Sequence, residues 1–326
     1  MRAVVVDSFG GPEALRVKDL PPPEPGRGQI VVDVAASGVN FLDCYQRSGK
    51  YDKPLPFIAG SEGAGDVSAV GSDVREVAVG DRVAWAMVDG GGYAEQVVVP
   101  ADRVVTVPTG VDLDMAAAAM LQGMTAHYLS ESTFPARAGQ TALVHAAAGG
   151  LGLLLTQMLT AKGVRVIGTT STGEKAAMAR AAGAAEIVDY TEDDVVGAVR
   201  GLTGDRGVDV VYDGVGRSTF DAGLDSLTRR GMMVLVGAAS GAVPPVDPQT
   251  LNKKGSLFLT RPTLADHIAD RAELVERGSA VLRMIAEGRL HIQIGGRYGL
   301  DAAHEAHRDL EGRRTMGKLL VQAESR

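Results

Sequence analysis

Three small residues, Ala147, Gly149 and Gly152, form the clearest chemical pattern in the sequence. Their spacing matches a dinucleotide-binding turn of the form G-x-G-x-x-G, with alanine in place of the first glycine. Glycine lets the backbone approach a pyrophosphate, and the following helix offers unpaired N–H groups and its positive dipole end to that charge. Such a match also occurs in ordinary turns. Here an apolar run at 142–145 precedes it and a helix-like run follows, which strengthens the prediction of a dinucleotide site.

The end of the next β-branched run indicates which dinucleotide binds. An NAD site usually has Asp or Glu there, about twenty residues past the glycines, to bind the ribose 2′-OH. This chain has Thr169, Thr170 and Ser171 instead, and Lys175 follows within one helical turn. No carboxylate repels a 2′-phosphate and the lysine can pair with one, so the sequence predicts NADPH. The competing interpretation of Lys175 is an ordinary solvated lysine. Glu174 fits a capping box with Ser171 as the N-cap.

The elements around these residues alternate between strands and helices from about residue 141 to residue 260. That alternation predicts an α/β fold with a doubly wound parallel sheet. The first 120 residues differ, because short β-branched runs separated by Gly, Pro and Asp are typical of a small barrel or sandwich. Amphipathic helices at 272–287 and 301–311 precede a final strand at 317–321, which we expect to return to the sheet of the first domain.

Composition excludes several classes of protein. The 326-residue chain has 33 Lys and Arg against 40 Asp and Glu, a formal net charge of −7, which argues against a nucleic-acid surface. Cys44 is the only cysteine, so the chain has neither an intrachain disulfide framework nor a Cys-rich metal site, and a reducing cytoplasm fits. No apolar run suggests a signal peptide or a membrane span, so we expect a cytoplasmic protein.

The histidines suggest no metal site. His304 and His307 lie three residues apart on a predicted helix, but no acid is clearly placed beside them, and we expect a solvated helix face. His127 and His145 lie on apolar segments, where we expect core histidines with satisfied hydrogen bonds.

Six segments together resemble the medium-chain dehydrogenase/reductase superfamily, and within it the zinc-independent NADPH quinone oxidoreductases related to zeta-crystallin. They are VNFLDCYQRSGKY, AGSEGAGDV, GGYAEQVVVP, HAAAGGLG, VVYDGVG and KGSLFLTRPTL, in this order along nearly the whole chain. The resemblance implies a mostly-β GroES-like substrate domain at 1–124 and 263–326, interrupted by a Rossmann NADPH-binding domain at 125–262.

The resemblance also implies which residues form the site. Asn40, Tyr45 and Tyr51 match the catalytic motif that borders the nicotinamide and the substrate, with Asn40 also a cofactor contact. The other implied cofactor contacts are Thr125 beside the nicotinamide, Gly150 and Leu151 in the pyrophosphate turn, Lys175 and Tyr190 around the 2′-phosphate and adenosine, and Gly237, Ala238, Phe258 and Arg261 around the nicotinamide ribose and the far lip. The alternatives are a packing role for Tyr190 and a surface role for Arg261.

The zinc alcohol dehydrogenases of this superfamily differ from the chain at two informative positions. They place a Cys near the position of Asn40 and a His at that of Ser61, and many carry four closely spaced cysteines. Zinc needs deprotonated Cys, His or carboxylate ligands in a near-tetrahedral array, and Glu62 alone cannot supply one. We therefore predict a metal-free enzyme.

The predicted function is NADPH-dependent reduction of quinones by hydride transfer. One alternative is an NADPH-dependent reductase of the double bond in 2-alkenals and enones, since the same site could serve both. An alternative of another class is an RNA-binding or structural crystallin-like protein, although the acidic charge weighs against RNA. The resemblance further suggests a homodimer paired through an edge strand at 256–260.

Overall fold

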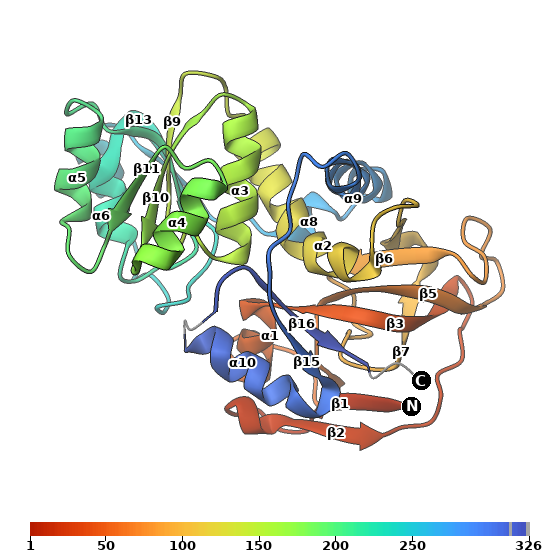
Figure 1. The fold of residues 1–326 in the computed structure, drawn as a ribbon. Helices are drawn as coiled ribbons and strands as arrows, with labels where there is room; N and C mark the ends of the chain where they lie inside the picture. Colours follow the sequence, from red (N-terminus) through yellow and green to blue (C-terminus); the bar gives the residue numbers. More distant parts are fainter. Residues whose placement is uncertain (313–314, 324–326) are drawn as a thin grey trace. The chain divides into compact units, whose positions relative to one another are not determined.

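The computed structural model describes residues 1–312 and 315–323 of the chain. The chain divides into two compact units, drawn in Figure 1. Unit 1 comprises Met1–Met124 and the segment from His267 onward, and unit 2 comprises Thr125–Asp266. The first boundary falls inside helix α2 (Leu113–Tyr128). Among the described residues, no helix is both long and apolar enough to cross a membrane.

Unit 2 is built on a six-stranded sheet in which all neighbouring strands run parallel. Its strands are β9 (Thr141–Val144), β10 (Arg165–Thr170), β11 (Glu186–Asp189), β12 (Val208–Asp213), β13 (Leu227–Leu235) and β14 (Phe258–Thr260). The spatial order β11-β10-β9-β12-β13-β14 is the 3-2-1-4-5-6 order of a dinucleotide-binding fold. The predicted doubly wound parallel sheet is therefore confirmed.

Helices cover both faces of this sheet. They are α3 (Gly150–Ala161), α4 (Gly173–Ala181), α5 (Val195–Leu202), α6 (Phe220–Ser226) and α7 (Pro248–Lys253), and α8 (Leu264–His267) crosses the second unit boundary. Helices α3 and α4 contact each other, and α5 and α6 form a second pair beside the sheet (Figure 1). Since the strands are parallel, the loops that follow β9, β10, β11 and β13 all lie at one edge of the sheet.

Unit 1 is mostly antiparallel β structure. A three-stranded sheet contains β2 (Leu15–Asp19), β1 (Arg2–Val6) and β4 (Phe57–Ile58), and a seven-stranded sheet contains β15 (Ile294–Gly299), β16 (Lys318–Gln322), β3 (Gln29–Val39), β5 (Glu62–Val70), β6 (Arg82–Ala86), β8 (Val104–Thr106) and β7 (Gln96–Pro100). Strand β16 pairs antiparallel with β3, so the predicted return of the last strand to the first domain's sheet is confirmed.

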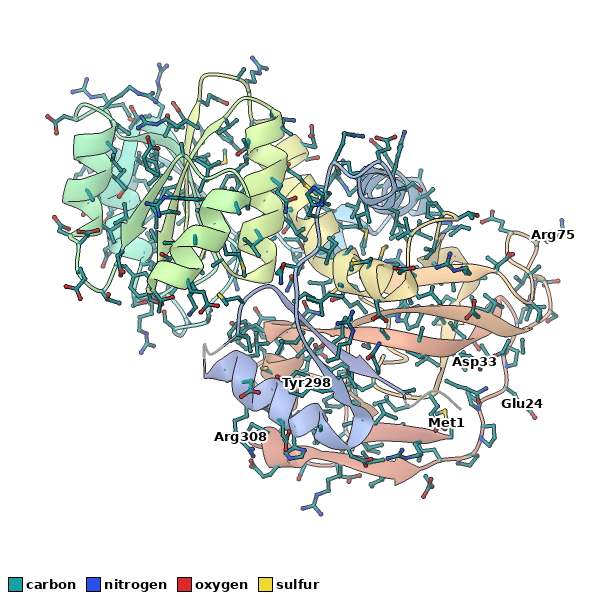
Figure 2. All side chains as sticks on the ribbon, viewed as in Figure 1. Met1, Glu24, Asp33, Arg75, Tyr298 and Arg308 are labelled. Atoms are coloured by element: carbon teal, nitrogen blue, oxygen red, sulfur yellow. The ribbon has the colours of Figure 1, made fainter. Side chains whose placement is uncertain are left out.

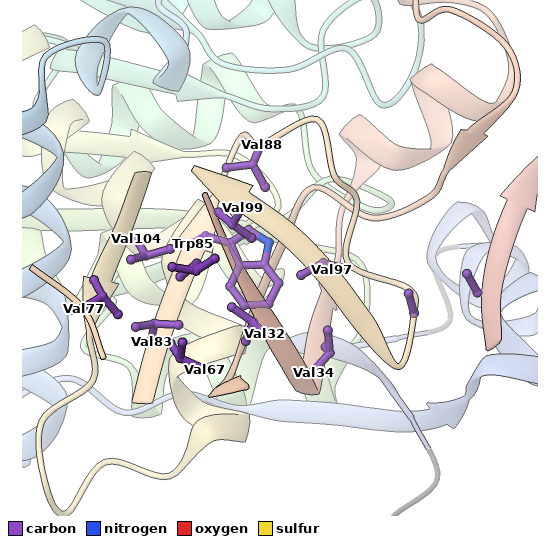
Figure 3. Close-up of a cluster of buried hydrophobic side chains, with 13 residues drawn as sticks. Val32, Val34, Val67, Val77, Val83, Trp85, Val88, Val97, Val99 and Val104 are labelled. Carbon is purple, nitrogen blue, oxygen red and sulfur yellow. The ribbon is translucent and has the colours of Figure 1, made fainter. Parts of the chain in front are cut away.

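Valine side chains fill the core of unit 1 around a single tryptophan. Trp85 is fully buried, and Val32, Val67 and Val97 belong to the same cluster (Figure 3). Val32 lies on β3, where alternate residues point to the same face of the strand. The cluster makes this sheet a rigid base for the residues that follow β3.

Unit 1 also contains helices. They are α1 (Phe41–Arg47), the first part of α2, α9 (Arg271–Ala286) and α10 (Ala303–Glu311). Short 3₁₀ turns lie at Pro12–Ala14, Ala101–Arg103 and Leu300–Ala302, and in unit 2 a π turn follows α2 at Leu129–Thr133. Helix α10 contacts α1, β15 and β16. Residues close to the C-terminus therefore support the helix that follows β3.

Candidate active site

The glycine turn of unit 2 has the geometry of a pyrophosphate cradle. Helix α3 begins at Gly150, and its N-cap, Gly149, has no side chain to bond the amides of the first turn. A Cβ atom on Gly152 would lie 2.5 Å from the carbonyl oxygen of Ala146 and 2.8 Å from the Cα of Ala147. Only glycine fits at this position, because backbone atoms occupy the space of a side chain. The open helix end suits an anion.

Two buried polar atoms beside this turn lack a hydrogen-bond partner among the described residues. They are Oγ1 of Thr170, at the end of β10, and Nε2 of His145, just after β9. The other ring nitrogen of His145 lies 3.2 Å from Oγ1 of Thr169, so the expectation of fully satisfied hydrogen bonds is wrong for His145. A buried unpaired polar group costs about 1–3 kcal/mol. Both atoms could therefore form hydrogen bonds with a polar ligand, such as a dinucleotide, bound at this edge of the sheet.

The ends of β10 and β11 bring Thr170 and Tyr190 together. The amide of Tyr190 donates to the carbonyl oxygen of Thr170 at 3.1 Å. Lys175 lies in the first turn of α4, where its backbone N–H donates to the hydroxyl of Thr172 at 3.2 Å. Thr172 is thus the N-cap of α4. The predicted capping box of Ser171 and Glu174 is wrong by one residue, since Thr172 has the extended backbone of a cap and Ser171 joins the strand to it.

Four of the predicted cofactor contacts lie around β13 and β14, and three of them follow a strand whereas the fourth begins one. Gly237 and Ala238 follow β13, and a Cβ atom on Gly237 would lie 2.6 Å from the carbonyl oxygen of Gly214, so the loops after β12 and β13 approach closely. Arg261 follows β14 and donates to the carbonyl oxygen of Leu235 at 2.9 Å. Phe258 instead begins β14, away from the edge where the strands end.

Thr125 is the first residue of unit 2, on the part of α2 that belongs to it. Its side chain is buried.

In unit 1, the side chain of Asn40 uses its full hydrogen-bonding capacity. Asn40 is the buried N-cap of α1. Its Nδ2 donates to Oε1 of Glu62 at 2.7 Å and to the carbonyl oxygen of Gly38 at 3.3 Å. Its Oδ1 accepts from Nζ of Lys318 at 2.6 Å and from Nε2 of Gln122 at 3.2 Å. The carboxamide is therefore fixed in one orientation by four partners.

A buried ion pair holds this arrangement. Nζ of Lys318 lies 2.5 Å from Oε1 of Glu62, and the two side chains are 2% and 0% exposed. The second carboxylate oxygen of Glu62 accepts from the amide of Leu121 on α2 at 2.6 Å. Sequence reasoning missed Lys318 and Gln122. For Lys318 the available signal was its position as the one charge in the apolar strand β16, since charges are buried only when paired.

Within residues 1–312 and 315–323, no group of three His, Cys, Asp or Glu side chains is arranged to hold a metal ion.

Tyr45 and Tyr51 form an aromatic surface at the end of α1. Their ring centroids lie 5.2 Å apart with the planes at 49°, and Phe41 extends the row at 6.1 Å from Tyr45. The side chain of Tyr51 is exposed and that of Tyr45 is half-buried. Aromatic faces of this kind can stack against a planar acceptor, and each tyrosine also carries a hydroxyl.

Comparisons with known proteins agree with this geometry. Residues 26–109 match the family description "Alcohol dehydrogenase GroES-like domain", and residues 150–275 match "Zinc-binding dehydrogenase". The chain is 44% identical to a quinone oxidoreductase of Pseudomonas aeruginosa over 96% of its own length and 97% of the relative.

Two solved structures are similar over 99% of the chain and all of the other protein. One is a mycobacterial protein complexed with NADPH, with a TM-score of 0.96 and 48% identity. The other is the Escherichia coli quinone oxidoreductase complexed with NADPH, with a TM-score of 0.97 and 40% identity. The chain therefore belongs to the zeta-crystallin-like quinone oxidoreductase family of the medium-chain dehydrogenase/reductase superfamily.

Proposed function

We propose that this protein is an NADPH-dependent quinone oxidoreductase that transfers hydride without a metal ion. The observation that carries the proposal is its end-to-end similarity to quinone oxidoreductases, one of them solved with NADPH. The residues at the C-terminal ends of the strands of unit 2 fit that cofactor. The glycine turn is open to an anion, and β10 does not end in an Asp or Glu that would repel the 2′-phosphate. A reducing cytoplasm suits the single buried cysteine, Cys44.

The residues proposed to hold NADPH form three groups. Gly149, Gly150, Leu151 and Gly152 bind the pyrophosphate through backbone amides. Thr170, Ser171, Lys175 and Tyr190 receive the adenosine and its 2′-phosphate, with the ammonium of Lys175 as the counter-charge. Thr125, Gly237, Ala238 and Arg261 serve the nicotinamide end. Phe258 is the weakest of the predicted contacts, because it begins β14 rather than following it.

Bound NADPH supplies the hydride. The acceptor quinone takes up that hydride and one proton to become a hydroquinone. Tyr45 and Tyr51 orient the planar acceptor with their rings, and a hydroxyl of the pair donates a hydrogen bond to the carbonyl that receives charge. Asn40 holds the start of α1 in place, since its side-chain carboxamide already forms hydrogen bonds with four partners within unit 1. A quinone accepts hydride readily, so no Lewis acid is required.

The decisive experiment compares two acceptors. NADPH oxidation is followed with a simple benzoquinone and with a 2-alkenal, and kcat/KM is measured for each. A clear preference for the quinone supports the proposal. A preference for the alkenal keeps the fold and the cofactor but makes the protein a double-bond reductase. Turnover of neither would contradict both reductase functions.

Lys175 provides a test of cofactor choice. Changing Lys175→Ala removes a charge-assisted contact of about 1.5–3 kcal/mol, which corresponds to roughly one to two decades in the NADPH dissociation constant. The affinity for NADH, which has no 2′-phosphate, should change little. Fluorescence titration of both cofactors checks this. An unchanged NADPH affinity in the variant would rule out Lys175 as the phosphate partner.

We further propose that the protein is a homodimer joined through β14. This strand is the last in the order of the six-stranded sheet, and Phe258 on it is 56% exposed. An edge strand with an exposed aromatic side chain is suited to pairing with its own copy across a twofold axis.

A further inference from the structure

A buried row of hydrogen bonds connects α10 to α1 within unit 1. Nη1 of Arg47 lies 3.1 Å from Nδ1 of His307, whose Nε2 lies 3.1 Å from the hydroxyl of Tyr93. That hydroxyl lies 3.2 Å from Oδ2 of Asp43. All four side chains are at most 2% exposed. They come from three distant parts of the sequence, so only the folded chain assembles them.

The chemistry of the groups fixes the direction of every bond in this row. Arginine can only donate, so Nδ1 of His307 accepts and the ring proton is on Nε2. The ring therefore donates to the oxygen of Tyr93, which leaves the single tyrosine proton for Asp43. The thiol of Cys44 lies 3.5 Å from the same Nδ1 atom and faces its acceptor side. The row thus runs from Arg47 through His307 and Tyr93 to a carboxylate.

The row holds α1 at both of its ends. Asp43 in the first turn also accepts from the backbone N–H of Asn40 at 2.8 Å and from the hydroxyl of Ser61 at 2.5 Å. Arg47 in the last turn also donates to Glu311 at 2.8 Å and to the carbonyl oxygen of Gly10 at 3.1 Å. Helix α1 has only seven residues, too few to be stable alone. Its position therefore depends on these tertiary contacts.

We propose that His307 and Tyr93 are positioning residues for the acceptor site, because they fix α1 and with it the pair Tyr45 and Tyr51. Tyr45 lies on α1 between the two anchored turns, and its carbonyl oxygen accepts the amides of Lys50 at 2.9 Å and of Tyr51 at 3.2 Å. A displaced α1 therefore moves both aromatic rings. The inference rests on the proposed role of these rings in binding the quinone.

The test uses a matched pair of tyrosines. Tyr93→Phe removes one hydroxyl from the row. Tyr298, labelled in Figure 2, lies outside the row, and Tyr298→Phe removes a hydroxyl that donates to Asp309 of helix α10 at 2.9 Å. Tyr93→Phe should lower kcat/KM for the quinone about tenfold, because small misplacements of a binding surface are costly. The NADPH dissociation constant should stay unchanged. Tyr298→Phe should alter stability without altering quinone kinetics.

Conservative replacement of the histidine provides a second readout. His307→Gln keeps one acceptor and one donor and should retain more quinone activity than His307→Leu, which keeps neither. Equal quinone kinetics in Tyr93→Phe and Tyr298→Phe would overturn the inference, as would equal effects of the two changes at His307.

Hydrogen exchange separates this inference from the proposed function. If the wild-type protein reduces no quinone, the proposed function fails, but exchange at the amides of residues 41–47 still reports on α1. Tyr93→Phe should speed that exchange and Tyr298→Phe should not. Equal exchange in the two variants would show that the row does not position α1.

Discussion

The carboxamide of Asn40 is held by a buried ion pair. Lys318 and Glu62 are almost completely buried, and each also binds Asn40. Removing two charges from water costs several kcal/mol per ion, so such a pair adds little net stability compared with apolar side chains. Its value is geometric, because each charge requires the other and both fix the amide. Loss of one partner should therefore lower the free energy of unfolding much more than loss of both charges.

The change Lys318→Met tests this at the level of one side chain. It leaves Glu62 buried without its partner and should lower the free energy of unfolding by about 3–5 kcal/mol, measured by urea denaturation. The double variant Lys318→Met with Glu62→Gln should recover a large part of that loss. As a control, Arg27→Gln removes an exposed pair with Asp73 and should cost less than about 1 kcal/mol. Equal losses in the single and double variants would contradict the argument.

His307 makes stability depend on pH. Burial, with a smaller contribution from Arg47, lowers the pKa of His307 to about 3. Between about pH 6.5 and pH 3 the histidine of the unfolded chain, with a pKa near 6.5, is protonated, whereas His307 in the folded chain is not. The contribution of neutral His307 to the free energy of unfolding is therefore complete above about pH 6.5 and is lost as the pH falls toward 3. Burial of Asp43 raises its pKa to about 6, despite the hydrogen bonds from Ser61 and Asn40, and acts in the opposite direction.

Comparison with His307→Gln isolates the histidine, because Asp43 titrates in both proteins. The difference in unfolding free energy between wild type and variant should shrink by about 2 kcal/mol between pH 7 and pH 5. Urea denaturation at both pH values measures it. A difference that is independent of pH would mean that His307 is not neutral in the folded protein.

Among the elements, the turn between β9 and α3 depends most strictly on one residue. Gly152→Ala places a methyl group against backbone atoms of Ala146 and Ala147, so the turn must shift. We expect NADPH affinity to fall at least tenfold, because the amides that bind the pyrophosphate move with the turn. Gly201→Ala on α5 is the control, since its added Cβ meets no atom within 4 Å. That change should leave binding intact and slightly raise stability. Similar NADPH affinities in the two variants would contradict this role of the turn.

The elements also show what a single sequence can and cannot predict. The strand, glycine turn and helix around Gly152 are visible because the whole pattern lies within about thirty residues. The burial of His307 is not visible in the sequence pattern, and the expectation that it lies on a solvated helix face is wrong. A signal was present, since His307 shares the buried side of α10 with Ala303 and Ala306. Its partners Tyr93 and Arg47 are more than 200 positions away, and no local pattern connects them.

For the whole molecule, the proposed dimer makes a simple prediction. Phe258→Glu places like charges near a twofold axis and should convert the protein to monomers in sedimentation velocity experiments. Val79→Glu is a matched control, since Val79 is 62% exposed but lies in unit 1. It should leave the oligomeric state unchanged. A monomeric wild type, or a Phe258→Glu variant that remains dimeric, would contradict pairing through β14.

The pairing of β16 with β3 has a consequence for synthesis. Strand β3 ends at Val39, whereas its neighbour β16 begins at Lys318, so 279 residue positions separate the end of one from the start of the other. At roughly 5–20 residues per second, the ribosome needs on the order of 15–60 s to deliver the missing neighbour. Unit 2 is contiguous and can fold during that interval. The nascent chain must therefore carry an incomplete first unit, with the end of β3 at residues 37–39 unpaired on one side, until β16 has been synthesised. Chaperones that shield such edges would have this interval in which to act.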